Sequence, residues 1–149
     1  MNTEGNNGLI HKIIVRDYRD EDYQGLKLLW EATGLDDPRR GDDRETIART
    51  LEQGGKLFIA ILPGGKLIAS AWVTSDGRRL HLHHVGVLPE FQRKGIGRFL
   101  SVRSIEFARQ KQLQLKLEVH RSNKPAVDLY RSLGFSYLGD YDVYIMRSF

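Results

Sequence analysis

The chain has 149 residues, and none of them is a cysteine. Without thiols there can be no disulfide bond, no thiolate metal ligand and no cysteine nucleophile. The absence also fits a reducing compartment, so we expect a cytoplasmic protein.

Long hydrophobic runs are missing too. A membrane-spanning helix needs about 18 or more consecutive apolar residues, and the sequence contains no such run. Residues 1–8 are polar and glycine-rich and lack the apolar segment of a signal peptide. We expect residues 1–8 to form a flexible tail, residues 9–149 to form a single domain, and no membrane to be a partner.

Basic residues outnumber acidic residues only slightly. Lys and Arg number 23 against 19 Asp and Glu, which gives a net charge of +4. A nucleic-acid-binding surface needs a stronger basic patch and aromatic residues for base stacking, so no nucleic-acid partner is expected. Arg93, Lys94 and Arg98 do gather around two glycines, and this local patch favours a small polyanion.

Hydrophobic periodicity predicts an α+β domain. Apolar residues recur at helical spacing over residues 20–34 and 44–53, and glycines follow both segments. Apolar runs separated by short Pro-Gly-Gly and Asp-Gly turns predict antiparallel strands. These strands are expected over residues 10–15, 57–62, 67–74 and 80–88.

The second half of the chain predicts a parallel connection. A helix over 95–111 is followed by a strand over 113–119 and a helix that Asn123 caps and Gly134 ends. A strand–helix–strand unit implies a parallel pair inside a mixed sheet. With a closing hairpin over 135–138 and 143–146, the expected total is about seven strands with four helices. The buried side of the 95–111 helix is expected to carry Ile96, Phe99, Leu100 and Phe107.

A glycine loop lies between a strand and a helix at residues 92–97. Glycines allow backbone amides to approach an anion closely, and a helix N-terminus favours negative charge. The loop lacks the Gly-Lys-Ser/Thr of the nucleoside triphosphatase loop and the three glycines of the dinucleotide fingerprint. From these residues alone, phosphate binding and a tight turn without a ligand both remain open.

Two motifs resemble the GCN5-related N-acetyltransferase (GNAT) family. The first is Val85-Gly86-Val87-Leu88-Pro89-Glu90-Phe91-Gln92-Arg93-Lys94-Gly95-Ile96-Gly97. The second comprises Leu117-Glu118-Val119, Ser122-Asn123, Ala126, Leu129-Tyr130 and Leu133-Gly134-Phe135. The resemblance extends from about residue 80 to residue 135 and implies a GNAT-like acyl-CoA N-acyltransferase fold.

The resemblance also implies acetyl-CoA as the co-substrate, without a metal. The pantetheine arm would pair with the strand at residues 85–87, and the pyrophosphate would lie on the amides of the glycine loop. Gly86 would allow the strand to bulge, with a close helix contact as the alternative. The implied coenzyme-binding set is Val85, Gly86, Val87, Gln92, Arg93, Lys94, Gly95, Ile96, Gly97, Arg98, Asn123 and Tyr130.

Tyr130 is the candidate general acid. In the family a tyrosine at this place lies near the coenzyme sulfur, where its hydroxyl would protonate the leaving thiolate. The alternative is one more apolar residue of an amphipathic helix.

The candidate bases are His81, His83 and Glu118. His81 and His83 lie two residues apart on a strand and share a face, and imidazole titrates near neutrality. They resemble the histidine pair of arylalkylamine N-acetyltransferases, whereas Glu118 resembles the glutamate of ribosomal-protein alanine N-acetyltransferases. Solvated strand faces are the alternative for both, and His84 is expected on the opposite face. A metal site is not expected, because no third ligand accompanies the histidines.

The expected function is direct transfer of an acetyl group, in a ternary complex, to a primary amine of a small molecule. A peptide or protein N-terminal acetyltransferase and a non-catalytic acyl-CoA sensor are the alternatives. In the loop at residues 35–43, the aspartates could attract a cationic amine and Arg39 and Arg40 could bind a carboxylate. We favour the alternative of a solvated loop with internal ion pairs. The acceptor and the assembly state, including a homodimer, stay open.

Overall fold

The computed structural model describes residues 11–149, so the predicted tail at residues 1–8 lies outside the described residues. The chain divides into two compact units, Met1–Glu118 and Val119–Phe149. Among residues 11–149, no helix is both long enough and apolar enough to cross a membrane.

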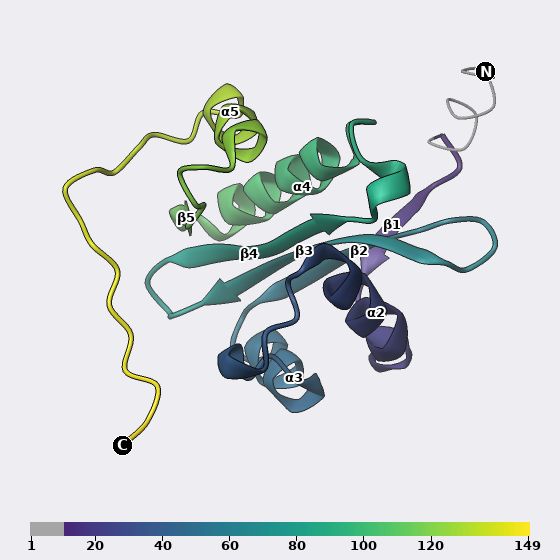
Figure 1. Ribbon diagram of the computed structural model, residues 1–149, viewed down its shortest axis with the longest axis horizontal. Coiled ribbons are helices and arrows are strands. Elements are labelled where there is room, and N and C mark those ends of the chain that lie inside the picture. The colour runs from purple at the N-terminus through teal and green to yellow at the C-terminus, as the bar shows by residue number, and fades with distance from the viewer. Residues whose placement is uncertain (1–10) are drawn as a thin grey trace. The chain divides into compact units, whose positions relative to one another are not determined.

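The first unit is built on a five-stranded mixed sheet in the order β1-β2-β3-β4-β5 (Figure 1). The first four strands pair antiparallel, whereas β5 pairs parallel with β4. A parallel pair needs a crossover, which α4 provides. The strands are β1 (Ile14–Asp17), β2 (Lys56–Ile61), β3 (Leu67–Ser75), β4 (Leu80–Val87) and β5 (Leu115–Leu117).

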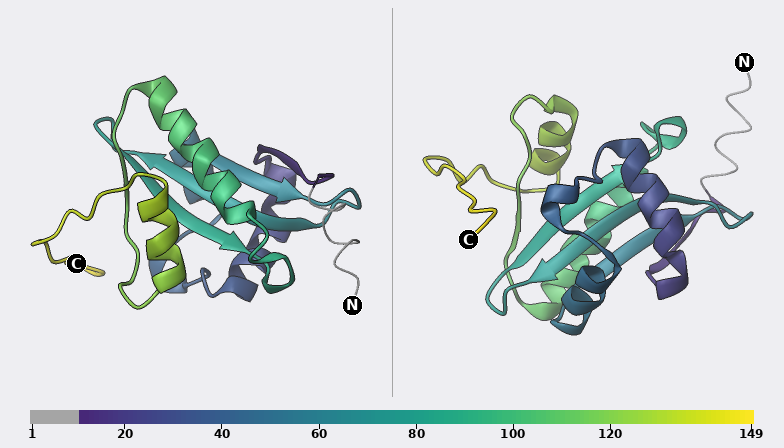
Figure 2. Two further views of the ribbon diagram at one scale, coloured as in Figure 1. Left: turned by 90° about the horizontal axis from the view of Figure 1, so that it is seen from above. Right: turned by 60° about the horizontal axis from the view of Figure 1, so that its bottom comes forward.

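Helices cover both faces of this sheet. Figures 1 and 2 show α2 and α3 on one face and α4 on the other. Gly34 ends α2 with a φ of +73°, a backbone conformation that glycine adopts without strain. Asp43 caps α3, because its side chain accepts a hydrogen bond of 2.8 Å from the Thr46 amide. The helices are α2 (Tyr23–Thr33), α3 (Arg44–Glu52) and α4 (Ile96–Lys111), with the short turns η1 (Asp20–Asp22), η2 (Pro38–Arg40) and η3 (Pro89–Phe91).

The core fills the space between the sheet and these helices. The apolar runs of β2 and β3 are buried on both faces of the sheet, as in a central strand covered from both sides. Predicted strands and helices in the first unit agree with the observed ones within a few residues. One inward prediction is wrong: Phe99 lies at the edge of the α4 stripe and is 50% exposed.

The second unit contains α5 (Lys124–Ser132). Asn123 caps it by accepting from the Ala126 amide at 3.4 Å, and Gly134 ends it with a φ of +97°. Both features were predicted from the sequence.

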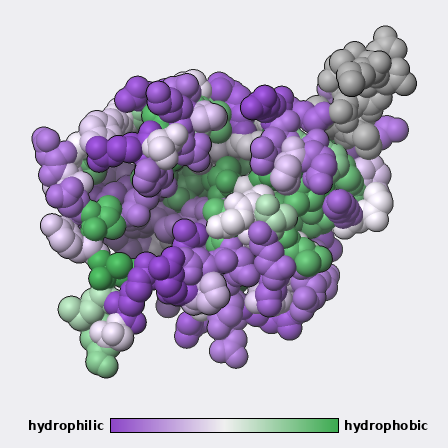
Figure 3. Space-filling view, viewed as in Figure 1, coloured by the Kyte–Doolittle hydropathy of each residue, from purple (hydrophilic) through white to green (hydrophobic). Residues whose placement is uncertain are grey.

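The predicted closing hairpin is wrong. Residues 135–149 form no strand, so the sheet has five strands rather than seven. A hairpin is stable only when a further strand or a helix covers its apolar face, and within this unit only the nine residues of α5 are available. Hydrophobic side chains near the C-terminus therefore lie on the surface (Figure 3). They are Tyr137, Leu138, Tyr141, Val143, Tyr144, Ile145, Met146 and Phe149.

Candidate active site

A β-bulge interrupts β4 in the middle of the predicted motif. Ser70 pairs with Gly86 and Trp72 pairs with His83, so β4 carries one extra residue between these pairs. His84 takes up the distortion with a left-handed φ of +49°. The extra residue breaks the strict alternation of side chains along the strand.

The bulge turns His84 onto the face that α2 and α3 cover. Its ring meets Trp30 edge-on at 4.6 Å and Trp72 at 5.4 Å between centroids. The prediction that His84 lies on the opposite face from His83 is therefore wrong. Side chains alternate between faces only in a regular strand, and the bulge begins directly after His83.

Gly86 lies at the edge of the bulge and also packs closely against the end of α2. A Cβ at this position would lie 2.8 Å from Leu35 Cδ1 and 3.3 Å from Thr33 Oγ1. The end of α2 and the residue after Gly34 thus pack closely on Gly86, and a Cβ there would require the Leu35 side chain to shift. The bulge lies directly next to Gly86, and the residue within it that adopts a left-handed φ is His84.

Trp30, Trp72 and Ser70 form a rigid aromatic platform beneath the bulge. The indoles of Trp30 and Trp72 stack with 5.6 Å between centroids. Ser70 is fully buried; its hydroxyl accepts from Trp30 Nε1 at 3.0 Å and donates to the His84 carbonyl at 2.8 Å. Trp72 Nε1 donates to Thr50 Oγ1 of α3 at 3.0 Å. The platform therefore joins α2, α3, β3 and β4.

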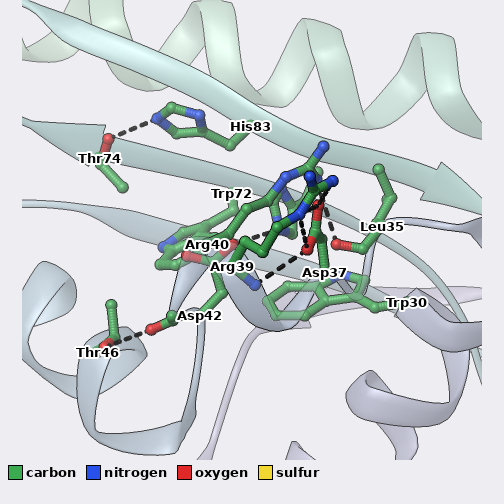
Figure 4. A network of polar contacts seen from close by, with 12 residues as sticks. Trp30, Leu35, Asp37, Arg39, Arg40, Asp42, Thr46, Trp72, Thr74 and His83 are labelled. Carbon is green, nitrogen blue, oxygen red and sulfur yellow. Dashed lines mark hydrogen bonds and ion pairs between the residues drawn. The ribbon is translucent and has the colours of Figure 1, made fainter. Parts of the chain in front are cut away.

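The loop at residues 35–43 contacts His84 beside this platform. Asp42 Oδ2 lies 2.9 Å from His84 Nε2, at ion-pair distance but outside hydrogen-bond alignment. Arg39 pairs with Asp37, with 2.8 Å between Nη2 and Oδ2, and this pairing holds the pKa of Asp37 at about 2. Figure 4 shows Asp37, Arg39 and Arg40 in one view with Trp30, Trp72 and the contact between Thr74 and His83.

His81 and His83 lie together on β4, as predicted. Their rings are 6.1 Å apart and nearly parallel, and His83 Nε2 lies 2.9 Å from Thr74 Oγ1. The surrounding protein lowers the pKa of His83 to about 4, and the nearby charges of His84 and His81 act in the same direction. Part of the His83 ring is exposed to solvent, which moderates this effect, so we conclude only that the ring is neutral near pH 7.

Glu118 directly follows β5 at the end of the first unit. Lys116 pairs with His81 in the parallel register. Exposure alternates along residues 113–119, and Lys116 and Glu118 are both exposed. By this alternation Glu118 projects from the same side of the chain as Lys116, on the face that carries His81.

The glycine loop has the geometry of an anion-binding turn. Arg93 and Gly95 adopt left-handed φ values of +61° and +84°, and Gln92 Nε2 donates to the Val87 carbonyl at 2.9 Å. The first amides of α4 have no partner within the helix and point out of its N-terminus. A hollow of about 170 Å³ adjoins the loop; its lining is Ile13, Val15, Lys94, Gly95, Ile96 and Phe99.

Asn123 and Tyr130 belong to the second unit. The Tyr130 ring packs edge-on against Phe135 at 5.6 Å, and burial raises the pKa of its hydroxyl. The participation of these two residues in a joint site stays a prediction.

Ser70, Trp72 and Thr74 were not predicted from the sequence as parts of this site, and the contact of Asp42 with His84 was not predicted either. The alternation of Ser70, Trp72 and Thr74 along β3 is the one signal that could have indicated a shared polar face. Within residues 11–149, no group of three His, Asp or Glu side chains is placed to hold a metal ion.

Comparison with known proteins identifies the family. The model of the acetyltransferase (GNAT) family matches residues 7–135. The chain belongs to the GNAT family.

Curated GNAT relatives match part of their own length. Streptothricin acetyltransferase of Streptomyces lavendulae is 34% identical over 102 residues, which cover 66% of this chain and 54% of that protein. N-alpha-acetyltransferase RimI of Mycobacterium tuberculosis is 36% identical over 86 residues, or 55% of this chain and 53% of that protein. The chain thus spans about half the length of these relatives.

Solved GNAT structures share the fold. An acetyltransferase from Streptococcus agalactiae gives a TM-score of 0.74 at 22% identity and covers 91% of this chain and 92% of its own. The structure of AAC(6')-Iy with a bisubstrate analog gives 0.71 at 19% identity, covering 91% and 99%. These likenesses confirm the predicted fold class.

The glycine loop fits the coenzyme A that GNAT proteins use. Gly97 is the second residue of α4, and glycine is less favourable than alanine in a helix, by up to about 1 kcal/mol in its interior. A Cβ on Gly97 would meet only Val87 Cγ2 at 3.7 Å, and a Cβ on Gly95 would meet nothing within 4 Å. Protein packing therefore does not require glycine at position 97, which is what a surface left open for a ligand predicts.

Proposed function

We propose that the chain is an acetyl-CoA-dependent N-acetyltransferase that transfers the acetyl group directly to a primary amine of a small molecule. The observation that carries this proposal is the glycine loop, which follows a bulged β4 bearing His81 and His83 and leaves open space at Gly95 and Gly97. The family match supports the reaction class.

The coenzyme would be held by two parts of the first unit. The backbone of Val85, Gly86 and Val87 would pair with the pantetheine arm, and the amides of Gln92–Gly97 would bind the pyrophosphate with help from the basic side chains of Arg93, Lys94 and Arg98. Asn123 would add a contact from the second unit. Bound acetyl-CoA supplies an activated acyl group as a thioester.

The acceptor ammonium must lose a proton before it can react. The neutral ring of His83, in contact with Thr74, is able to accept or relay this proton, and His81 lies beside it. Glu118 is the third candidate base. For the leaving group, the raised pKa of Tyr130 keeps a proton on its hydroxyl, where general acid catalysis needs one.

A second candidate function is acetylation of peptide N-termini. It is favoured by the 36% identity with N-alpha-acetyltransferase RimI over 86 residues. The two candidates differ only in the acceptor, so one assay separates them.

The test is release of free thiol from acetyl-CoA by the purified chain with a panel of small amines and peptides with free N-termini. The proposal expects amine-dependent release, with small amines preferred. Release only with peptides would support the second candidate. Protection against heat by acetyl-CoA without release would indicate a sensor and contradict both.

Tyr130→Phe tests the general acid. Phe keeps the contact with Phe135 and removes the proton donor, so kcat should fall about 10²–10⁴-fold while coenzyme affinity and Tm stay close to those of the parent. A kcat within about threefold of the parent would contradict the assignment.

A further inference from the structure

The loop at residues 35–43 carries four aspartates and two arginines. The contacts of these side chains within the protein determine which of them can bind an acceptor. Asp37 is paired with Arg39, Asp42 lies against His84, and Asp43 caps α3. Three of its four aspartates are therefore engaged within the protein, and the fourth, Asp36, is exposed to solvent. Arg39 thus neutralises Asp37, and Asp42 faces His84, whereas Asp36 and Asp43 keep exposed carboxylates.

Arg40 is engaged differently from these acids. Its Nη1 donates to the Leu35 carbonyl at 3.2 Å, and within residues 11–149 it contacts no carboxylate. A guanidinium carries five N–H donors in a planar fork. One contact leaves the others for a ligand, and the fork matches a carboxylate in two places at once.

Arg40 lies in a loop that contacts β4, the strand that carries the histidine pair. It ends η2, and its amide donates to the Asp37 carbonyl at 2.9 Å. Two residues later Asp42 fastens the loop to His84 on β4. Burial and the neighbouring histidines lower the pKa of His83, and the charge of Arg40 contributes in the same direction, so Arg40 is within electrostatic reach of that ring.

The chain next to the histidine pair, in and just after β5, carries charges of both signs. Lys116 is in register with His81, and Glu118 projects from the same side of the chain two residues later. A carboxylate such as Glu118 suits an ammonium group, whereas Arg40 suits an anion. The face around His81 and His83 therefore offers one place for each end of an amine that also carries an acid.

We propose that the acceptor is an amine bearing a carboxylate, as an amino acid does, and that Arg40 binds this carboxylate. Arg40 is then a specificity-determining residue. This inference rests on the proposed acetyl transfer.

The test compares matched compounds with the full chain and acetyl-CoA. One set is L-phenylalanine, L-phenylalaninamide and phenethylamine, and the other is L-leucine, L-leucinamide and isopentylamine. Within each set the carboxylate is kept, replaced by a carboxamide or removed, while the primary amine and the side chain are retained; initial rates are compared at equal concentrations of the unprotonated amine. Binding is read independently of turnover from tryptophan fluorescence, because the only two tryptophans, Trp30 and Trp72, both form the platform beside the loop.

The variant is Arg40→Gln, and the matched control is Arg109→Gln, which removes an exposed arginine from α4 on the other face of the sheet. We expect the amino acids to have a KM about tenfold lower than their amides in the parent, and Arg40→Gln to abolish this difference with little change in kcat. Amides and plain amines should be unaffected by Arg40→Gln, and Arg109→Gln should behave as the parent.

Three results separate the possible failures. Acetylation without any preference for the carboxylate, or a KM effect of Arg40→Gln that is equal for all compounds, overturns the inference alone. Binding of the amino acids that depends on Arg40, without acetylation, supports the inference and overturns the proposed function. Neither binding nor acetylation of any compound overturns both.

Discussion

At the scale of single residues, Ser70 holds the candidate site together. One buried hydroxyl satisfies both the Trp30 indole N–H and the His84 carbonyl. Ser70→Ala leaves both groups without that partner, and each unsatisfied buried group costs about 1–3 kcal/mol. We predict a loss of about 2–4 kcal/mol in the free energy of unfolding, measured by urea titration.

Ser104→Ala is the matched control for Ser70→Ala. Ser104 is equally buried, but its hydroxyl donates to the Leu100 carbonyl one turn earlier in α4, an acceptor that the helix already uses. Its removal should cost less than about 1 kcal/mol. Equal losses in the two variants would contradict the bridging role of Ser70.

His83 gives a pH dependence with a definite sign. The pKa of its ring is lowered to about 4 in the folded chain, against about 6.5 in the unfolded chain. Between these values the unfolded state binds more protons, so the free energy of unfolding falls as the pH is lowered from about 6.5 toward about 4. Above a pH of about 6.5 the His83 ring is neutral in both states, so it no longer lowers the free energy of unfolding.

The prediction is therefore that His83→Gln loses less stability than the parent over this acid range. Urea midpoints at several pH values measure it, and His11→Gln, at an exposed position, is the control. Parallel curves for the parent and His83→Gln would show that His83 does not have a lowered pKa in the folded state.

Residue types and strand periodicity predicted that His81 and His83 share a face, because alternation holds from residue 81 to residue 83. They did not predict His84 against Trp30, because a bulge depends on the pairing of two strands and leaves no local pattern. The pairing of Asp42 with His84 likewise joins residues that are far apart in the chain.

At the scale of elements, a substitution at the start of α4 is expected to change coenzyme binding without lowering the stability of the fold. Gly97→Ala adds a Cβ that meets only Val87 at an ordinary distance of 3.7 Å, and alanine is favoured in a helix by up to about 1 kcal/mol. We predict an unchanged or higher Tm without ligand, together with a smaller increase of Tm when acetyl-CoA is added.

The control for the loop is Gly64→Ala in the β2–β3 turn, where a Cβ would meet nothing within 4 Å. It should leave the acetyl-CoA-dependent increase of Tm unchanged. An increase that Gly97→Ala preserves in full would contradict coenzyme binding at this loop.

Helices and strands could be predicted from the sequence where the local pattern of residues matches the side chains that are buried in the fold. The cap at Asn123 and the helix ends at Gly34 and Gly134 depend only on neighbouring residues, and the structure confirms all three predictions. The hairpin over residues 135–146 was predicted from apolar alternation alone. Whether such a segment forms strands depends on a covering surface that the segment itself does not encode.

At the scale of the whole molecule, the order of the elements determines the fold. Antiparallel strands followed by one helical crossover allow few topologies, and the two motifs selected the GNAT family, which the family match confirms. The acceptor is less predictable, because it depends on how a few charged side chains of the 35–43 loop are paired. Those pairings appear only in the folded chain.

The most direct test of the central claim follows the acetyl group itself. The full chain is incubated with acetyl-CoA labelled in its acetyl carbons and a primary amine that supports thiol release, and the products are identified by mass spectrometry. Our account predicts the label on the amine nitrogen, in an amount equal to the thiol released. Label recovered only as free acetate, or retained on the coenzyme while the amine stays unmodified, would contradict it.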